Sequence, residues 1–131
     1  MDTEHTNDYG MHLIVDGYDA NPQALRDIAR AYRFLDELPA RIGMQKIGPP
    51  QLSNFDDPMM AGITGIIQIV TSHISIHTYA NKGCVFLDVF SCQTFSCEDV
   101  IAHACEVFGI QTVDTHIIRR GKQFPEHNTH S

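Results

Sequence analysis

The chain has few positive charges, no tryptophan and no long apolar run. Its 131 residues carry nine Lys and Arg against 16 Asp and Glu, which gives a formal net charge of −7. Proteins that hold nucleic acid through its phosphates present basic surfaces, so this class of function is not expected. No segment approaches the roughly 20 apolar residues of a membrane-spanning helix. The acidic, polar start MDTEHTNDYG is not a signal peptide, so we expect a cytoplasmic protein that neither crosses nor binds a membrane.

The cysteines form no pattern typical of a metal or disulfide site. There are four, at Cys84, Cys92, Cys97 and Cys105, and none is part of a C-x-x-C motif. This spacing argues against a zinc site, and no metal site is predicted. Without an export signal, we expect all four to be free thiols.

The length and the 43% hydrophobic content are typical of one globular domain, which we expect over residues 1–131. Apolar and helical patterns alternate in the order β-α-(β)-β-β-β-α-β. The expected strands are 11–15, a short edge strand within 46–62, 65–71, 75–79, 84–90 and 112–120. The hairpin between 75–79 and 84–90 is indicated by the turn sequence ANKG. The polar tail 122–131 is expected to be frayed.

Two helices are predicted by their start signals. Asn21-Pro22 is typical of a helix N-terminus, and this helix is expected to end before Gly43. Its apolar face is expected at helical spacing, at Leu25, Ile28, Ala29, Tyr32 and Leu35. Ser96 is the expected N-cap of the second helix, with two acidic residues in the first turn, where the helix dipole favours them.

These elements predict an α+β fold: a two-layer α/β sandwich with a mainly antiparallel sheet and two helices on one face. One layer of helices covers only one face of the sheet. The other face must meet solvent or a partner. We therefore expect a homodimer formed through the sheets, with four layers in all.

The stretch TSHISIHTY, residues 71–79, places reactive side chains between the apolar runs GIIQIV and CVFLDVF. A serine in a strained bend can attack the carbonyl before it, which replaces the amide by an ester. Elimination of that ester cuts the chain and leaves an N-terminal pyruvoyl group, which takes up a substrate amine and accepts the electrons of decarboxylation. The chemistry needs a serine, a histidine and a second acid–base group. Ser72, His77 and Cys92 could supply these, although composition and spacing alone do not single out this reaction.

The block SHISIHT followed by LDVFSC resembles the small bacterial and archaeal S-adenosylmethionine decarboxylases. That family is pyruvoyl-dependent and carries a pattern like E-S-H-I-S-I-H-T-W-P-E, then D-V-F-T-C. HLIVDGYDANPQAL, GITG and RRG extend the likeness over roughly residues 10–121. The resemblance implies a two-layer sandwich that dimerises into four layers, self-cleavage between residues 71 and 72, and a role in spermidine biosynthesis.

The resemblance also implies the roles of single residues. Ser72 matches the serine that becomes the pyruvoyl group, and His77 matches the histidine that abstracts a proton during self-cleavage. Cys92 matches the proton donor in decarboxylation. Thr64 stands where the family has a serine that helps processing, and Thr71 supplies the carbonyl that is attacked. His73 and Ser75, within the same block, support either the strand or the processing geometry.

The departures from the family pattern fall on the part that recognises the nucleoside. Thr71 replaces a glutamate, Tyr79 a tryptophan and Ala80 a proline. Asn81 replaces a glutamate that the family uses on the ribose hydroxyls of the substrate. Phe55 resembles an aromatic residue that stacks on adenine, although it lies about three residues too far from GITG. Phe55, Tyr79 and Asn81 are therefore the expected substrate-binding residues.

Three functions remain open from the sequence. The first, which the whole block favours, is a decarboxylase of S-adenosylmethionine, a small cationic substrate compatible with an acidic protein. The second is the same chemistry on ornithine or arginine, which the changes at Tyr79 and Asn81 favour. The third is an unprocessed, non-catalytic homologue that regulates an active subunit, and only Thr71 favours it.

Overall fold

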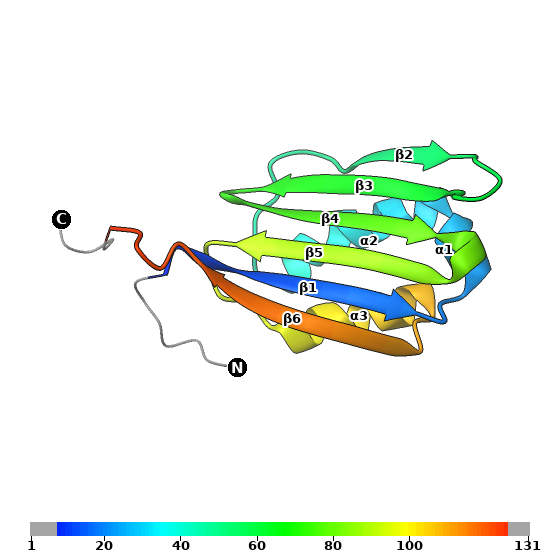
Figure 1. Cartoon of the computed structure of the whole chain (residues 1–131). Helices are drawn as coiled ribbons and strands as arrows, with labels where there is room; N and C mark the ends of the chain where they lie inside the picture. The colour runs from blue at the N-terminus through cyan, green and yellow to red at the C-terminus, as the bar shows by residue number, and fades with distance from the viewer. Residues whose placement is uncertain (1–7, 126–131) are drawn as a thin grey trace.

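The computed structural model describes residues 8–125. The chain forms β1 (Gly10–Tyr18), α1 (Pro22–Arg26), α2 (Ile28–Arg41), β2 (Gln51–Phe55), β3 (Gly62–Ile69), β4 (Ser72–Tyr79), a 3₁₀ turn (Ala80–Lys82), β5 (Cys84–Ser91), α3 (Cys97–Phe108) and β6 (Thr112–Arg120). The six strands make one sheet in the order β2-β3-β4-β5-β1-β6, and each neighbouring pair is antiparallel (Figure 1). The predicted α+β class with an antiparallel sheet is confirmed.

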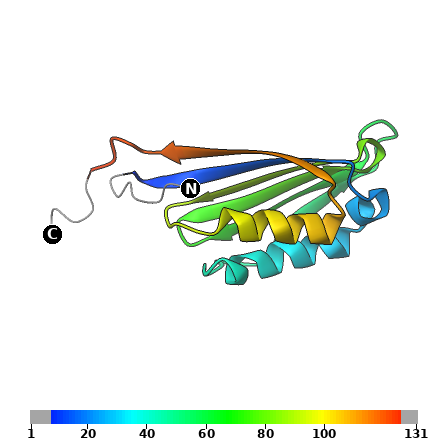
Figure 2. The same cartoon turned by 90° about the horizontal axis from the view of Figure 1, so that it is seen from below.

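All three helices lie on one face of the sheet, and no described element covers the other (Figure 2). The buried strand residues alternate with partly exposed ones, as in β4, where Ile74 and Ile76 face the helices. The open face carries the other set of side chains, among them Ile66, which is 41% exposed. None of the helices in residues 8–125 has the length and apolar composition that crossing a membrane would require.

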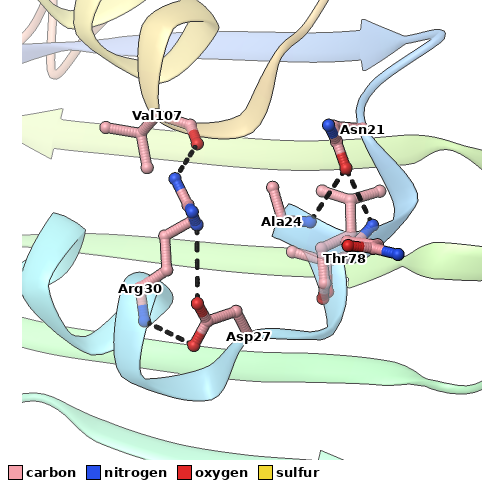
Figure 3. A network of polar contacts seen from close by, with 8 residues as sticks. Asn21, Ala24, Asp27, Arg30, Thr78 and Val107 are labelled. Atoms are coloured by element: carbon pink, nitrogen blue, oxygen red, sulfur yellow. Dashed lines mark hydrogen bonds and ion pairs between the residues drawn. The ribbon is translucent and has the colours of Figure 1, made fainter.

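The first predicted helix is two helices, and the prediction of one continuous helix is wrong. Asn21 caps α1 with Pro22 in its first turn, as expected. The backbone then becomes extended at Asp27, whose side chain accepts a hydrogen bond from the Arg30 N–H and starts α2. Figure 3 shows these caps, together with the Arg30 guanidinium, which donates to the Val107 carbonyl at 3.0 Å.

The predicted apolar face of this segment is only partly correct. Leu25 and Leu35 are buried as expected, but Ala29 is exposed, and Ile28 and Tyr32 are 39% and 41% exposed. The buried face of α2 instead consists of Ala31, Phe34, Leu35, Leu38 and Pro39. Thr78 of β4 ties α1 to the sheet, because its buried hydroxyl donates to the Leu25 carbonyl at 2.9 Å.

The second half of the chain follows the prediction more closely. Ser96 caps α3, and its side chain accepts a hydrogen bond from the Asp99 N–H. His103 of α3 lies in the core, stacked on Phe34 at 5.3 Å between ring centroids. Burial, with a smaller contribution from Arg41, lowers the pKa of His103, so it packs as a neutral ring. β2 is the expected edge strand, and β4 and β5 form the expected hairpin.

The strand bounds differ from the prediction at one functionally important point. The predicted strand 65–71 ends at Ile69, and the strand predicted to begin at Ser75 begins at Ser72. Val70 and Thr71 therefore form the turn of a β3–β4 hairpin, in which Ile69 pairs with Ser72. Residues 126–131 of the predicted frayed tail lie outside the described part, and Phe124 packs against Tyr9 with ring centroids 4.9 Å apart.

Candidate active site

Thr71, the residue before Ser72, has a backbone conformation that side chains rarely adopt. Its φ is +56°, in the left-handed region. A β-branched residue is an outlier there because its Cβ crowds the backbone, at a cost of roughly 1–2 kcal/mol. Among the described residues, Asp19 is the other non-glycine residue with positive φ. The expected scissile bond, Thr71–Ser72, therefore lies in a tight and strained bend.

Cys92 lies against this bend. Ser72 pairs with Ser91 in the β4–β5 ladder, which places the next residue of the chain, Cys92, beside the β3–β4 turn. Its Sγ is 2.7 Å from the Thr71 hydroxyl, and that hydroxyl donates to the Val70 carbonyl at 2.6 Å. Thr71 has one hydroxyl proton, so the thiol is the donor when the hydroxyl bonds Val70. The structure thus brings Thr71, Ser72 and Cys92 together.

His77 and Thr64 form a second pair, on the neighbouring strands β4 and β3. They face each other in the ladder, and the Thr64 hydroxyl is 3.2 Å from Nδ1 of His77. The hydroxyl can therefore fix the orientation of the imidazole ring, which is what a proton-transferring histidine needs. The resemblance implied roles for both residues, and the structure adds that they touch.

The two groups are not adjacent within one chain. His77 is five positions along β4 from Ser72, which is about 16 Å at the usual rise of a strand. Strand alternation also directs the two side chains to opposite faces, since Ser72 has the parity of the buried Ile74 and Ile76. The single chain therefore does not bring the expected nucleophile and the expected proton acceptor together.

A shallow hollow of about 400 Å³ opens beside Ser72. Its walls contain Ile47, Ile66, Gln68, Ile69, Thr71, Ser72 and His73, with no carboxylate among them. Burial, and next the neighbouring His12, lower the pKa of His73, which favours its neutral form at this wall. A second cavity of about 350 Å³ lies on the helix side, around Asn21, Asp27 and Glu106, and contains none of the expected site residues.

The expected substrate-binding residues gather at the other end of the sheet. Phe55 pairs with Gly62, and Gly62 pairs with Tyr79, so the two aromatic residues lie in one cross-strand row. Gly62 is required between them, because a Cβ there would lie 1.7 Å from the Thr78 carbonyl oxygen. Phe55 is 54% exposed.

Asn81, next to this row, already has partners for its amide. Its Oδ1 accepts a hydrogen bond from Nη2 of Arg26 at 2.7 Å, and its Nδ2 donates to the Pro58 carbonyl at 3.0 Å. The bond from Arg26 uses one of the two lone pairs of this oxygen, which leaves one for a ribose hydroxyl. Phe55, Tyr79 and Asn81 are thus brought near one another, but in one chain they are a strand length away from Ser72.

A polar and aromatic cluster on the open face was not predicted from the sequence. His12 of β1 contacts Asp88 of β5 at 3.0 Å, and the Ser75 hydroxyl donates to the same carboxylate at 3.5 Å. The Phe90 ring next to it lies under the Arg120 guanidinium at 4.6 Å. These contacts join β1, β4, β5 and β6, so they depend on strand order, which no local pattern reveals. Within residues 8–125, no group of three or more metal-ligating side chains is present.

Comparisons with known proteins agree with this architecture. The chain is 27% identical to the S-adenosylmethionine decarboxylase proenzyme of Thermococcus kodakarensis over 113 residues, 86% of this chain and 76% of that protein. It is 29% identical to the proenzyme of the same description from Pyrococcus horikoshii, over 86% of this chain and 78% of the relative. The crystal structure of the adenosylmethionine decarboxylase from Aquifex aeolicus superposes with a TM-score of 0.71 at 22% identity, covering 87% of this chain and 92% of that one. The family model for S-adenosylmethionine decarboxylase matches residues 11–121, so the chain belongs to the S-adenosylmethionine decarboxylase family.

Proposed function

We propose that the chain is a self-processing, pyruvoyl-dependent decarboxylase of S-adenosylmethionine that acts in spermidine biosynthesis in the cytoplasm. Within this family, the observation that carries the proposal is the bend at Thr71–Ser72. A strained peptide, a serine directly after it and a thiol beside it are the parts that self-cleavage and decarboxylation need. The same bend argues against a purely regulatory, unprocessed homologue, because a non-catalytic chain has no need of the strain.

Self-cleavage would proceed in two steps. The Ser72 hydroxyl attacks the Thr71 carbonyl carbon, the C–N bond breaks, and the hydroxyl proton ends on the freed amine, which leaves an ester. A base then removes the Ser72 α-proton, the Cβ–O bond breaks, and residues 1–71 leave with a new carboxylate. The dehydroalanine that remains tautomerises, and water releases ammonia to give the pyruvoyl end of residues 72–131. His77, oriented by Thr64, is the proposed base.

The pyruvoyl group would bind the substrate amine and accept electrons as carbon dioxide leaves. Proton donation and the positioning of the substrate would depend on side chains near Ser72. Cys92 is the proposed donor of the proton that the substrate carbon then takes up, because its thiol reaches the bend that carries Ser72. The hollow lined by Ile47 and Ile66 provides room next to the reacting carbon.

We propose further that the active form is a homodimer with a site shared between its two chains. His77 is about 16 Å along β4 from Ser72 of its own chain, too far for proton transfer. None of the described elements covers the open face of the sheet (Figure 2). Strand alternation places His77, Tyr79 and Ile66 on this face. A second copy packed on this face would supply its His77–Thr64 pair, and its Phe55–Tyr79 row, to the Ser72 end of the first. There the base has to reach the Ser72 α-proton, and not the Ser72 side chain, which is directed to the opposite face.

A second substrate class has one observation in its favour. The family glutamate that binds the ribose is Asn81 here, and its acceptor oxygen already bonds Arg26. Hydrogen bonds to charged groups contribute roughly 1.5–3 kcal/mol, against about 1 for neutral ones. Because a carboxylate accepts from both ribose hydroxyls, the change could weaken nucleoside binding by about 1–2 kcal/mol, or roughly five- to thirtyfold at tenfold per 1.4 kcal/mol. The binding of ornithine or arginine, which have no ribose, would not be weakened by this change.

The substrate can be identified by measuring how fast the processed enzyme releases carbon dioxide from S-adenosylmethionine, ornithine, arginine and lysine. We expect S-adenosylmethionine to be turned over fastest, and Asn81→Glu to improve its kcat/KM by about five- to thirtyfold, because a carboxylate accepts both ribose hydroxyls. Gln111→Glu, an exposed change away from the row, adds the same charge and is the control. Turnover of a free basic amino acid without turnover of S-adenosylmethionine would establish the second class instead.

A further inference from the structure

Thr71 carries the carbonyl that Ser72 is expected to attack, but two of its features concern its backbone conformation and its side chain instead. It occupies the left-handed region although it is β-branched, and its hydroxyl is 2.6 Å from the Val70 carbonyl oxygen and 2.7 Å from Cys92 Sγ. The side chain is exposed, so packing in the core does not impose this conformation. The two-residue β3–β4 turn, closed by the Ile69–Ser72 pair, itself requires an unusual conformation at its third residue, and the two contacts of the Thr71 hydroxyl add to this constraint.

We propose that Thr71 is a positioning residue for self-cleavage, whose hydroxyl bridges the Val70 carbonyl and the Cys92 thiol and thereby holds the Thr71–Ser72 bend in its strained form. The inference rests on the proposed self-cleavage. The thiol donates to the hydroxyl and the hydroxyl donates to the carbonyl, so a single chain of hydrogen bonds ties β5 to the β3–β4 turn. The turn itself is only two residues long, between the paired residues Ile69 and Ser72.

The strain acts on the step that converts the amide to an ester. An amide is planar and resists rotation about its C–N bond, whereas the C–O bond of the ester rotates more freely and adds the Ser72 Cβ and Oγ to the link. The longer link lets Thr71 leave the left-handed region. Strain present in the amide and absent from the ester moves this equilibrium towards the ester, which is otherwise the less stable form.

The test measures the ester directly in a His77→Ala chain. Without the proposed base the ester is not eliminated, and hydroxylamine added after unfolding cleaves it to a Thr71 hydroxamate and a free Ser72 amine. The cleaved fraction, read by mass spectrometry, is the ester content. Thr71→Val keeps the shape and removes the hydroxyl, Thr71→Gly removes hydroxyl and strain, and Thr71→Ser keeps the hydroxyl.

We expect the ratio of ester to amide to fall about tenfold in Thr71→Val and Thr71→Gly, which corresponds to about 1.4 kcal/mol. Thr71→Ser should stay within about twofold of the parent, since the bridging hydroxyl remains. Asp19→Gly is the matched control, because it relieves the other positive φ, away from the bend, and should leave the ratio unchanged.

Equal ester content in all Thr71 variants would overturn the inference, and so would an equal fall in Asp19→Gly. Cleavage between Val70 and Thr71 would also overturn it, since Thr71 would then be the nucleophile. These results leave the proposed function standing if the wild-type chain still cuts itself before Ser72. A wild-type chain that never forms the ester or cleaves would overturn the proposed function and this inference together.

Discussion

Two variants that cannot cut themselves, Ser72→Ala and His77→Ala, are expected to restore cleavage when they are produced together. In a mixed dimer, the Ser72 of the His77→Ala chain meets the intact His77 of its partner, so one of the two shared sites is complete. Random pairing at equal amounts places about half of the chains in mixed dimers. Up to about half of the His77→Ala chain should therefore be cut, against essentially none when either variant is produced alone.

The measurement uses different affinity tags on the two chains and mass analysis of each after co-expression. The Ser72→Ala chain should stay whole, because it has no nucleophile, which makes it an internal control. Absence of cleavage in the mixture, although the wild-type chain is cut, would show that His77 acts within its own chain or not at all. The roughly 16 Å between Ser72 and His77 along β4 would then need a rearrangement of this strand.

Removal of the Cys92 thiol is expected to have the other large effect. Loss of general acid catalysis typically lowers a rate by about 10²–10⁴-fold. Cys92→Ala should therefore lower carbon dioxide release by this factor per mole of pyruvoyl group. Self-cleavage should slow by at most about tenfold, because the Thr71 hydroxyl keeps its bond to Val70 and loses one partner worth about 1 kcal/mol.

The control is Cys105→Ala, on α3, which lies on the helix side of the sheet and away from both the bend and the Phe55–Tyr79 row. It removes a thiol of similar exposure and should leave both cleavage and turnover unchanged. Full turnover by Cys92→Ala would remove Cys92 from the proposed mechanism. Complete loss of cleavage in Cys92→Ala would give the thiol its main role in processing instead.

Those features of the fold that depend only on residues close together in the sequence could be predicted. Asn21-Pro22 and Ser96 start helices through bonds to residues two or three positions away, so their sequence is sufficient. The break at Asp27 was missed because aspartate also occurs inside exposed helix faces. Only the cap that it forms with Arg30 distinguishes the two cases.

In the candidate site too, the residue identities could be predicted from the sequence, whereas the contacts between residues far apart in the chain could not. Ser72, His77 and Cys92 were identified because the sequence around them resembles that of a family. Such a comparison of sequences does not require the three-dimensional structure. The contact of Thr71 with Cys92, and the distance between Ser72 and His77, follow from strand register. Register depends on turn length and on which faces are buried along several strands. A shift by one residue would have moved each of these side chains to the other face.

Self-cleavage before Ser72 can be seen in the intact mass of the purified wild-type protein. Two fragments are expected, residues 1–71 with an ordinary carboxyl end and residues 72–131 with a pyruvoyl group in place of the N-terminal serine. The second fragment should resist Edman degradation and react with borohydride, since it carries a ketone and no amine. One whole chain with unmodified Ser72 after long incubation would show that the protein does not cut itself and is not a pyruvoyl enzyme.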